Sequence, residues 1–200
     1  MFKKTLAALA STVLIVGSET LAQEATDEAV ANTESTLSLG EEVPQTPREP
    51  QVGETYIGSV EGDWALRCLK AEEGSVDPCQ LYQLLNDENG NSVAEMSLFP
   101  IPNGERAAAG ATIVVPLETF LTEQVTLTID GGTARRYPFT FCNNAGCVAR
   151  VGFTDEEIAL FKGGNQAIMR IVPAAAPDEE VLLTISLTGF TAAYNKLENS

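Results

Sequence analysis

Apolar and polar residues alternate with a period of two along most of the chain from about residue 57 onward. Successive side chains of a strand point to opposite faces of a sheet, so this alternation is typical of strands with one buried face. Nine stretches follow the pattern: residues 64–68, 79–84, 93–98, 112–115, 124–130, 137–141, 147–151, 167–172 and 181–187. Between them, residues 87–91 and 130–132 contain the Asn, Asp and Gly residues that hairpin turns require.

One segment departs from this alternation. Thr154 is followed three residues later by Glu157, the spacing of a capping box, and the apolar residues that come next end at Gly163 and Gly164. The segment therefore predicts a helix of about two turns. Its acidic residues 155–157 fall in the first turn, where the helix dipole favours negative charge, so capping explains them without a catalytic role.

About nine short strands, one short helix and frequent turns predict an all-β fold. We expect an antiparallel β-sandwich over residues 57–197, stapled by disulfides. A domain of this length buries a core without help from a metal.

The first 22 residues have the order of a cleavable secretory signal. Lys3 and Lys4 precede an apolar run over residues 6–16, and small residues end at Ala22. This predicts a periplasmic or secreted protein. The run is shorter than the roughly 18 residues that span a bilayer, and no later segment comes closer, so the chain is not expected to be membrane-spanning.

Residues 23–56 are rich in Glu, Thr, Ser, Ala and Pro, which predicts a disordered acidic tether. A solvated spacer and an acidic tail that docks on a partner both fit this composition. The formal net charge of the whole chain is −16, and acids outnumber bases in both the tether and the domain. Nucleic acid is therefore a disfavoured partner, because phosphate contacts need a basic surface.

The four cysteines are Cys68, Cys79, Cys142 and Cys147. Export places them in an oxidising environment, where they are expected to form structural disulfides. Four cysteines allow three pairings, and sequence alone does not choose among them. The local pairing is favoured because residues 142–147 form a tight turn that sets Cys142 opposite Cys147. A redox site is the rival interpretation, but active dithiols usually have the closer Cys-x-x-Cys spacing.

The chain contains no histidine, which excludes serine–histidine and cysteine–histidine nucleophiles and histidine-ligated zinc. No cofactor or metal site is predicted, since the ligand spacing of a calcium-binding EF-hand loop is also missing. Carboxylate chemistry remains open. Asp63 and the clusters at residues 155–157 and 178–180 are the visible acids, but nothing in the sequence indicates that two of them converge in one pocket.

Arg135, Arg136 and Arg150 form the densest basic group of the domain. If Cys142 and Cys147 are paired, these arginines are expected on one hairpin, where they could contact an anion or an acidic partner. Ordinary solvated or ion-paired arginines are the alternative.

Two aromatic residues are predicted to belong to the core. Trp64 is in phase with Leu66 and Cys68 on its stretch, so it shares their buried face. Phe190 follows Gly189 after the last apolar stretch, and Gly189 is expected to be a turn that lets the ring fold back over the end of the sandwich.

Several segments together resemble one known family. They are residues 61–64 before Cys68, Gln80 and Gln83 after Cys79, and residues 114–117, 125–131, 141–142, 146–147, 160–164 and 186–193. In this order they resemble the invasion-associated locus B family of exported bacterial proteins over nearly all of residues 58–195.

The resemblance implies a function but no catalytic residues. The family is named for a locus that promotes invasion of red blood cells, and its members also occur in bacteria that invade nothing. We therefore expect a non-catalytic binding module that contributes to host-cell interaction or envelope maintenance, with an unknown envelope or surface protein or glycan as partner.

Two other classes of function remain as alternatives. One is a carboxylate-dependent envelope hydrolase that acts on a glycan or cell-wall substrate, and the other is a purely structural envelope-stress protein. A cleft with two facing acids would favour the hydrolase, whereas a flat exposed apolar or charged patch would favour the binding module.

Overall fold

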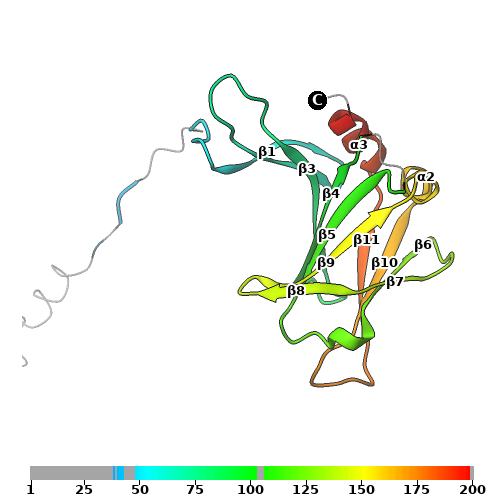
Figure 1. The fold of residues 1–200 in the computed structure, drawn as a ribbon. Coiled ribbons are helices and arrows are strands. Elements are labelled where there is room, and N and C mark those ends of the chain that lie inside the picture. The colour runs from blue at the N-terminus through cyan, green and yellow to red at the C-terminus, as the bar shows by residue number, and fades with distance from the viewer. Residues whose placement is uncertain (1–37, 39, 43–47, 103–105, 199–200) are drawn as a thin grey trace, which may run out of the picture. The chain divides into compact units, whose positions relative to one another are not determined.

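Two antiparallel sheets pack face to face in the computed structural model, which describes residues 38, 40–42, 48–102 and 106–198 (Figure 1). The predicted signal segment, and the predicted tether up to residue 47 apart from residues 38 and 40–42, lie outside the described residues. The predicted all-β sandwich is confirmed. Among the described residues the two sheets contain eleven strands, whereas the sequence predicted about nine. Two α-helices accompany the sheets, whereas the sequence predicted one.

The larger sheet has seven strands in the order β1-β2-β3-β4-β5-β9-β8. These strands are β1 Thr55–Glu61, β2 Trp64–Leu69, β3 Cys79–Asn86, β4 Ser92–Pro100, β5 Ala109–Val115, β8 Phe139–Asn143 and β9 Gly146–Phe153. The smaller sheet has the order β11-β10-β6-β7. Its strands are β6 Val125–Ile129, β7 Arg135–Tyr137, β10 Gln166–Ile171 and β11 Val181–Ser186. A 3-10 turn, η1 Leu121–Glu123, leads into β6.

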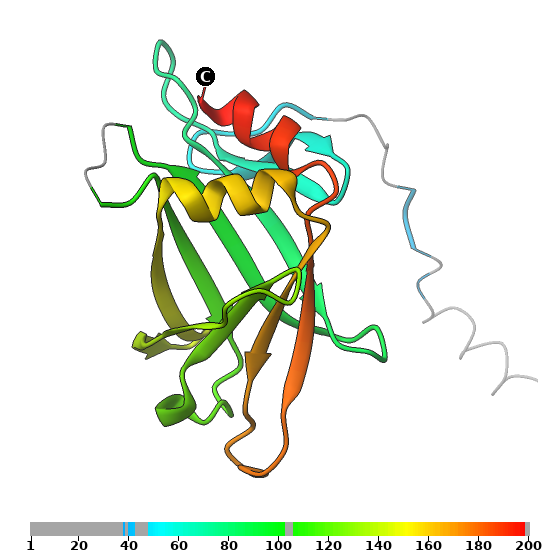
Figure 2. The same cartoon turned by 90° about the vertical axis from the view of Figure 1, so that its right-hand side faces the viewer.

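Both helices, α2 Asp155–Gly163 and α3 Phe190–Glu198, lie over the same end of the sandwich (Figure 2). The predicted capping box begins α2: Thr154 Oγ1 accepts from the Glu157 N–H at 3.3 Å, and Glu157 Oε2 accepts from the Thr154 N–H at 2.9 Å. No helix among the described residues is long and apolar enough to cross a membrane.

An aromatic cluster joins the helices to the sheets. Trp64 and Phe190 are fully buried, with their ring centroids 5.3 Å apart and the rings edge to face, which confirms that both belong to the core. Phe190 also stacks at 5.3 Å on Phe161 of α2 and at 5.6 Å on Tyr194 of α3. Each such pair stabilises the fold by about 0.5–1.5 kcal/mol beyond the burial of its area.

The predicted turn at Gly189 is present, but the helix α3, which begins directly after it at Phe190, was not predicted. The buried residues of α3 are Phe190, Ala193, Tyr194 and Leu197, which recur with the spacing of one helical face. This helical spacing is also present in the sequence, but the sequence-based prediction ended with a strand and included no helix after it.

Two further differences concern strands. The sequence predicted one strand over residues 137–141, but Pro138 separates β7 of the smaller sheet from β8 of the larger one. Proline has no N–H for a ladder and is favoured where a strand ends, so the chain changes sheets there. The strand β1 was not predicted because it is an edge strand with a register shift at Gly58, and its residues do not alternate cleanly.

The last residues of the predicted tether belong to the folded unit, which begins at Arg48. The Gly53 N–H donates to Lys70 O at 2.8 Å, and the Lys70 N–H donates to Glu54 O at 2.9 Å. Arg48 forms an ion pair with Glu54. The expectation of disorder is therefore wrong for residues 48–56.

These contacts predict where the chain tolerates truncation. Removing residues 1–47 should leave the thermal unfolding midpoint unchanged. Removing residues 1–54 should lower it by a few degrees, because two backbone hydrogen bonds of about 0.5–1.5 kcal/mol each are lost. Calorimetry of the two truncated chains beside the full chain tests this, and equal midpoints for both truncations would contradict it.

Candidate functional site

Both disulfides join neighbouring strands at directly opposed residues. Cys68–Cys79 links β2 to β3 and Cys142–Cys147 links β8 to β9, which is the local pairing that the sequence favoured. Each closes a short loop and stabilises the fold by about 2–3 kcal/mol through chain entropy. The structure therefore assigns both pairs a role as staples.

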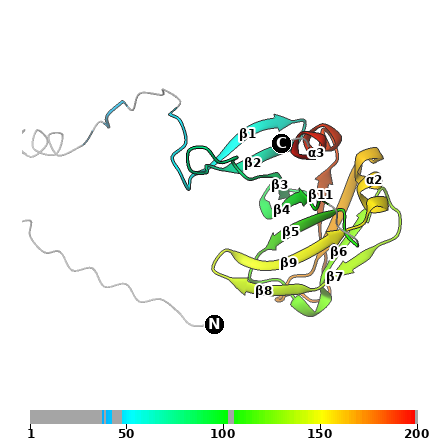
Figure 3. The ribbon, with the colours of Figure 1, turned by 45° about the horizontal axis from the view of Figure 1, so that its top comes forward.

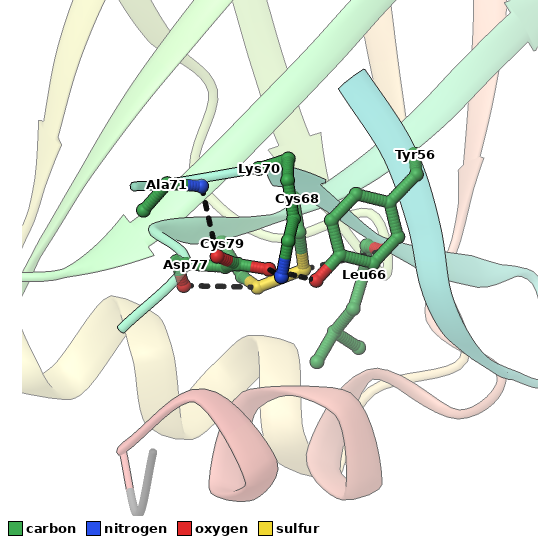
Figure 4. Close-up of a disulfide and its surroundings, with 7 residues drawn as sticks. All are labelled: Tyr56, Leu66, Cys68, Lys70, Ala71, Asp77 and Cys79. Atoms are coloured by element: carbon green, nitrogen blue, oxygen red, sulfur yellow. Dashed lines mark hydrogen bonds and ion pairs between the residues drawn. A yellow bond between two sulfur atoms is a disulfide. The ribbon is translucent and has the colours of Figure 1, made fainter. Parts of the chain in front are cut away.

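Asp77 organises the loop beside the β2–β3 disulfide (Figure 4). Its carboxylate accepts hydrogen bonds from Tyr56 Oη at 2.5 Å and from the Ala71 N–H at 2.8 Å, and it pairs with Lys70 Nζ at 3.3 Å. The hydrogen bond from Tyr56, and then that from Ala71, lowers the pKa of Asp77. These contacts tie residues 70–78 to β1.

The lowered pKa of Asp77 predicts a pH-dependent contribution to stability. Because the folded-state pKa lies below the unfolded value of about 3.9, the stabilisation is present above that value. It is lost as the pH falls through the folded-state pKa. Asp77→Asn should lower the thermal midpoint at pH 7, and the gap to the unmodified chain should narrow at successively lower pH.

Glu73→Gln provides the control, since it removes one charge from the same exposed loop. It should leave the midpoint unchanged at pH 7. A gap between Asp77→Asn and the unmodified chain that stays constant down to pH 2 would show that the carboxylate charge is irrelevant.

The turn after β1 meets the turn after β11 in a tight backbone contact. Gly189 has a φ of +83°, and a Cβ there would lie 2.0 Å from Glu61 O. Gly62 has a φ of +58°, and a Cβ there would lie 2.5 Å from Thr188 O. The Asp63 N–H donates to Thr188 O at 3.1 Å. Only glycine fits both positions, which brings together two sequence segments that are distant along the chain.

Four side chains with polar atoms complete this contact: Asp63, Trp64, Gln83 and Ser186. We call the two turns together with these four side chains the clasp. Gln83 is 7% exposed; its Nε2 donates to Ser186 O at 3.0 Å, and its Oε1 accepts from the Ser186 N–H at 2.8 Å. Trp64 Nε1 donates to the same carbonyl at 2.8 Å. Ser186 Oγ donates to Asp63 Oδ2 at 2.5 Å. The clasp therefore joins β2 and β3 of one sheet to β11 of the other.

A hollow of about 560 Å³ lies beside the clasp and is lined by Asp63, Gln83 and Ser186 together with Asp87 and Glu88. Its serine donates to a carboxylate, but the chain contains no histidine that could take up the serine proton. The polar atoms of the clasp are already used to connect the sheets. These hydrogen bonds stabilise the fold by joining the two sheets.

The structure places the three predicted acidic groups on separate elements. Asp63 lies in the β1–β2 turn, residues 155–157 begin α2, and residues 178–180 lie between β10 and β11. Glu157 is buried, with its Oε1 2.9 Å from Arg135 Nε and 3.2 Å from Tyr137 Oη. Burial, and then the charge of Glu157, raises the pKa of Tyr137 to about 12. Within the described ranges, no cluster of three or more Asp, Glu or Cys residues is suited to a metal ion.

The predicted arginines do not lie on one hairpin, which corrects the expectation. Arg135 and Arg136 are on β7, which pairs with β6, whereas Arg150 is on β9, which pairs with β8. The change of sheet at Pro138 is the reason. Arg135 is engaged by Glu157, while Arg136 and Arg150 are exposed, and the Arg150 guanidinium lies 5.5 Å from the centroid of the Phe141 ring.

The chain passes from β7 into β8 along one side of the molecule (Figure 3). Arg136 is the second residue of β7, and Arg150 on β9 follows Ala149, which pairs with Phe139 of β8. We call this region the β8 corner and define it by Leu121, Arg136, Phe139, Phe141 and Arg150. Leu121 and Phe141 are 41% and 42% exposed. A hollow of about 300 Å³ separates η1 from β8 and is lined in part by Leu121, Phe139 and Phe141.

The charges at this corner are unusual for an acidic protein. Most basic side chains of the described part form ion pairs with carboxylates: Arg48, Arg67, Lys70, Arg135, Lys162, Arg170 and Lys196. Among the described residues, Arg106, Arg136 and Arg150 have no carboxylate within ion-pair distance. Two of these three arginines belong to the β8 corner.

Another hollow, of about 720 Å³, lies between the end of β4 and the two helices. Its lining combines apolar residues such as Phe99 and Ile158 with Tyr194 and charged side chains. Lys162 at its rim forms an ion pair with Glu198 at 3.4 Å and lies over the Tyr194 ring. Asp155 also lines this hollow, so its charged side chains carry a net negative charge, in contrast to those of the β8 corner.

Comparison with known proteins agrees with this architecture. Two curated relatives, both described as invasion protein B homologs of Brucella abortus (strain 2308 and biovar 1 strain 9-941), are each 26% identical over 137 residues. Each alignment covers 68% of this chain and 76% of the relative. The crystal structure of invasion associated protein B from Bartonella henselae superposes with a TM-score of 0.59 at 22% identity, covering 73% of this chain and 95% of that one.

The family comparison covers most of the folded unit. Residues 64–198 match the model of the family described as invasion associated locus B (IalB) protein. The matched region runs from Trp64 of the clasp to the last described residue of α3 and includes the β8 corner. The chain belongs to the invasion associated locus B family.

Proposed function

We propose that this chain is an exported envelope or surface protein that binds an acidic partner, without catalysis, through the β8 corner. The predicted signal over residues 1–22 and the two disulfides support export. The relatives named as invasion proteins support a role in invasion. Maintenance of the envelope is the alternative role. The partner is an envelope or surface protein or glycan.

The observation that carries the proposal is the pair of arginines without carboxylate partners at the corner, Arg136 and Arg150. The whole chain has a net charge of −16, yet no carboxylate of the described residues forms an ion pair with either guanidinium group. Arginine and aromatic side chains contribute a large share of the binding energy at protein interfaces. Arg150 beside the exposed ring of Phe141 is such a combination.

The hydrolase receives less support from the geometry. The acids that the sequence singled out lie on three separate elements. The hollow beside the clasp does contain Asp63 together with Asp87 and Glu88, but Asp63 already accepts a hydrogen bond from Ser186, and Asp87 accepts hydrogen bonds within its own turn. A glycosidase of the usual kind needs two carboxyl groups that face each other across a substrate. A binding module needs only the exposed corner.

Site-specific cross-linking in cells tests the proposal. A photoreactive amino acid in place of Thr140, which lines the hollow of the corner, should yield discrete adducts. The same amino acid in place of Leu160, which is 57% exposed on α2, is the control and should yield none. Adducts of equal yield from both positions would contradict a dedicated surface.

Charge reversal sharpens this test. Arg136→Glu with Arg150→Glu should reduce the adducts from position 140 by roughly tenfold or more, because charge pairs across an interface become repulsive. Arg106→Glu is the matched control, since Arg106 also lacks a carboxylate partner among the described residues but precedes β5, outside the corner. It should leave the yield unchanged.

A further inference from the structure

We infer that the acidic partner binds as an additional β-strand along the free edge of β8. This inference rests on the proposed function and specifies the form of the partner: an extended segment in which acidic residues alternate with β-branched or aromatic ones.

The free edge is a consequence of the change of sheet at Pro138. Among the described residues, β8 pairs with β9 alone and ends the seven-stranded sheet. In an antiparallel ladder, alternate residues direct their N–H and C=O groups away from the paired strand. Such an edge is a template for another strand. The side chains from Thr140 to Asn143 are all exposed, so nothing described covers it.

The Cys142–Cys147 disulfide holds this edge in place. It joins β8 to β9 near the hairpin tip, and β9 in turn pairs along its whole length with β5. A strand that adds to β8 therefore meets a backbone that is already extended and fixed. Such preorganisation lowers the conformational entropy lost on binding.

Charge distinguishes β8 from the other free edges. The β1 edge ends at Glu61, whose carboxylate pairs with Lys196. A register shift does not distinguish the two edges, because β1 has one between Ile57 and Ser59 and β8 has one between Phe139 and Phe141. The β11 edge follows the acidic residues 178–180, and β7 has only three residues. The β8 edge is flanked by Arg136 and Arg150, neither of which pairs with a described carboxylate. Charge complementarity therefore selects an acidic strand at β8.

The side chains around the edge define the residues of the added strand. Phe141 and Arg150 lie on the same face of the larger sheet, because the guanidinium group stands near the ring. On that face the added strand would present an acid to Arg150 and an apolar side chain to Phe141. Leu121, across the hollow from β8, offers an apolar contact on the other side. Pro138 has no N–H, so the ladder begins at Phe139.

Selection of peptides from a displayed library of decapeptides against the full, disulfide-bonded chain tests the inference. The enriched peptides should alternate acidic and β-branched or aromatic residues. The strongest binder, made synthetically, should slow hydrogen exchange at the outward-facing amides of β8 by about tenfold or more. Arg136→Glu with Arg150→Glu should weaken its affinity by about tenfold or more, and Arg106→Glu should not.

A backbone-modified peptide separates strand addition from simple charge attraction. N-methylation of alternate amides keeps the charge and the side chains but removes the hydrogen bonds to β8. The methylated peptide should lose at least about tenfold in affinity, since several backbone hydrogen bonds are lost. If it binds as well as the parent peptide in an arginine-dependent way, strand addition is wrong while the proposed binding surface stands.

The remaining outcomes are also decisive. Selected peptides whose binding ignores the arginines, or a library without enrichment, would overturn the inference of strand addition, whereas the proposed surface is decided by the cross-linking from position 140. Protection of β8 amides in the free chain that disappears when residues 1–47 are removed would assign the edge to the chain's own acidic segment. Protection that rises with protein concentration would assign it to a second copy.

Discussion

Phe190→Ala is expected to destabilise the domain by about 3–5 kcal/mol, the range for a large aromatic truncated in a packed core. Phe190 is fully buried and its ring contacts Trp64, Phe161 and Tyr194, so the substitution leaves a cavity between α2, α3 and β2. A loss of this size is a large part of the stability of a typical domain. Urea unfolding followed by the fluorescence of Trp64, the only tryptophan, measures it.

Phe141→Ala is the matched control for that experiment, because its ring is 42% exposed at the β8 corner. It should change the free energy of unfolding by less than about 1 kcal/mol, as surface substitutions usually do. The same variant should lose cross-linking at the corner. Equal destabilisation by Phe141→Ala and Phe190→Ala would mean that the exposed ring serves the fold and not a partner.

Gly189→Ala is expected to cost about 2–4 kcal/mol, because the new side chain combines backbone strain with a steric conflict. At a φ of +83°, its Cβ would lie 2.0 Å from Glu61 O and 2.8 Å from the backbone nitrogen of Gly62. Both neighbours are backbone atoms, so relief requires the two turns of the clasp to separate. The measurement is again the free energy of unfolding in urea.

Gly90→Ala separates the cost of the backbone strain from the cost of the steric conflict. Gly90 has nearly the same φ, +82°, but a Cβ there would meet nothing within 4 Å. It should therefore show only the cost of positive φ, about 1 kcal/mol. If the two substitutions cost the same, the close approach of the two turns contributes nothing, and the clasp is looser than the structure indicates.

The clasp gives a structural role to two motifs of the family resemblance. The Gly62–Trp64 segment and the Ser186–Gly189 segment contact each other, and Gln83 lies between them. Motifs of this kind invite a catalytic interpretation because they contain aspartate, serine and glutamine. Their hydrogen bonds are directed at each other and at the backbone, which is the pattern of a structural contact.

Features that depend on neighbouring residues were predictable from the sequence. Alternation located most strands, and the capping box of Thr154 and Glu157 located α2. The Cys142–Cys147 pairing followed from one tight turn. In each case the interaction is local, so the sequence contains both partners within a few residues. The helix α3 could have been found in the same way from the spacing of Phe190, Ala193, Tyr194 and Leu197.

Features that depend on distant residues required the tertiary structure. The residues near Ser186 in the sequence do not indicate that its N–H donates to Gln83. Those near Arg135 do not indicate that it pairs with Glu157 of the α2 capping box. By itself the sequence determined that this is an acidic β domain with four cysteines, and it predicted both export and local disulfides. Only the tertiary structure decided which polar residues form contacts between the two sheets. It also decided which arginines lie near the edge strand β8 without a described carboxylate partner. The reason is that the strand order of two sheets, and the change of sheet at Pro138, are set by packing between segments far apart in the chain.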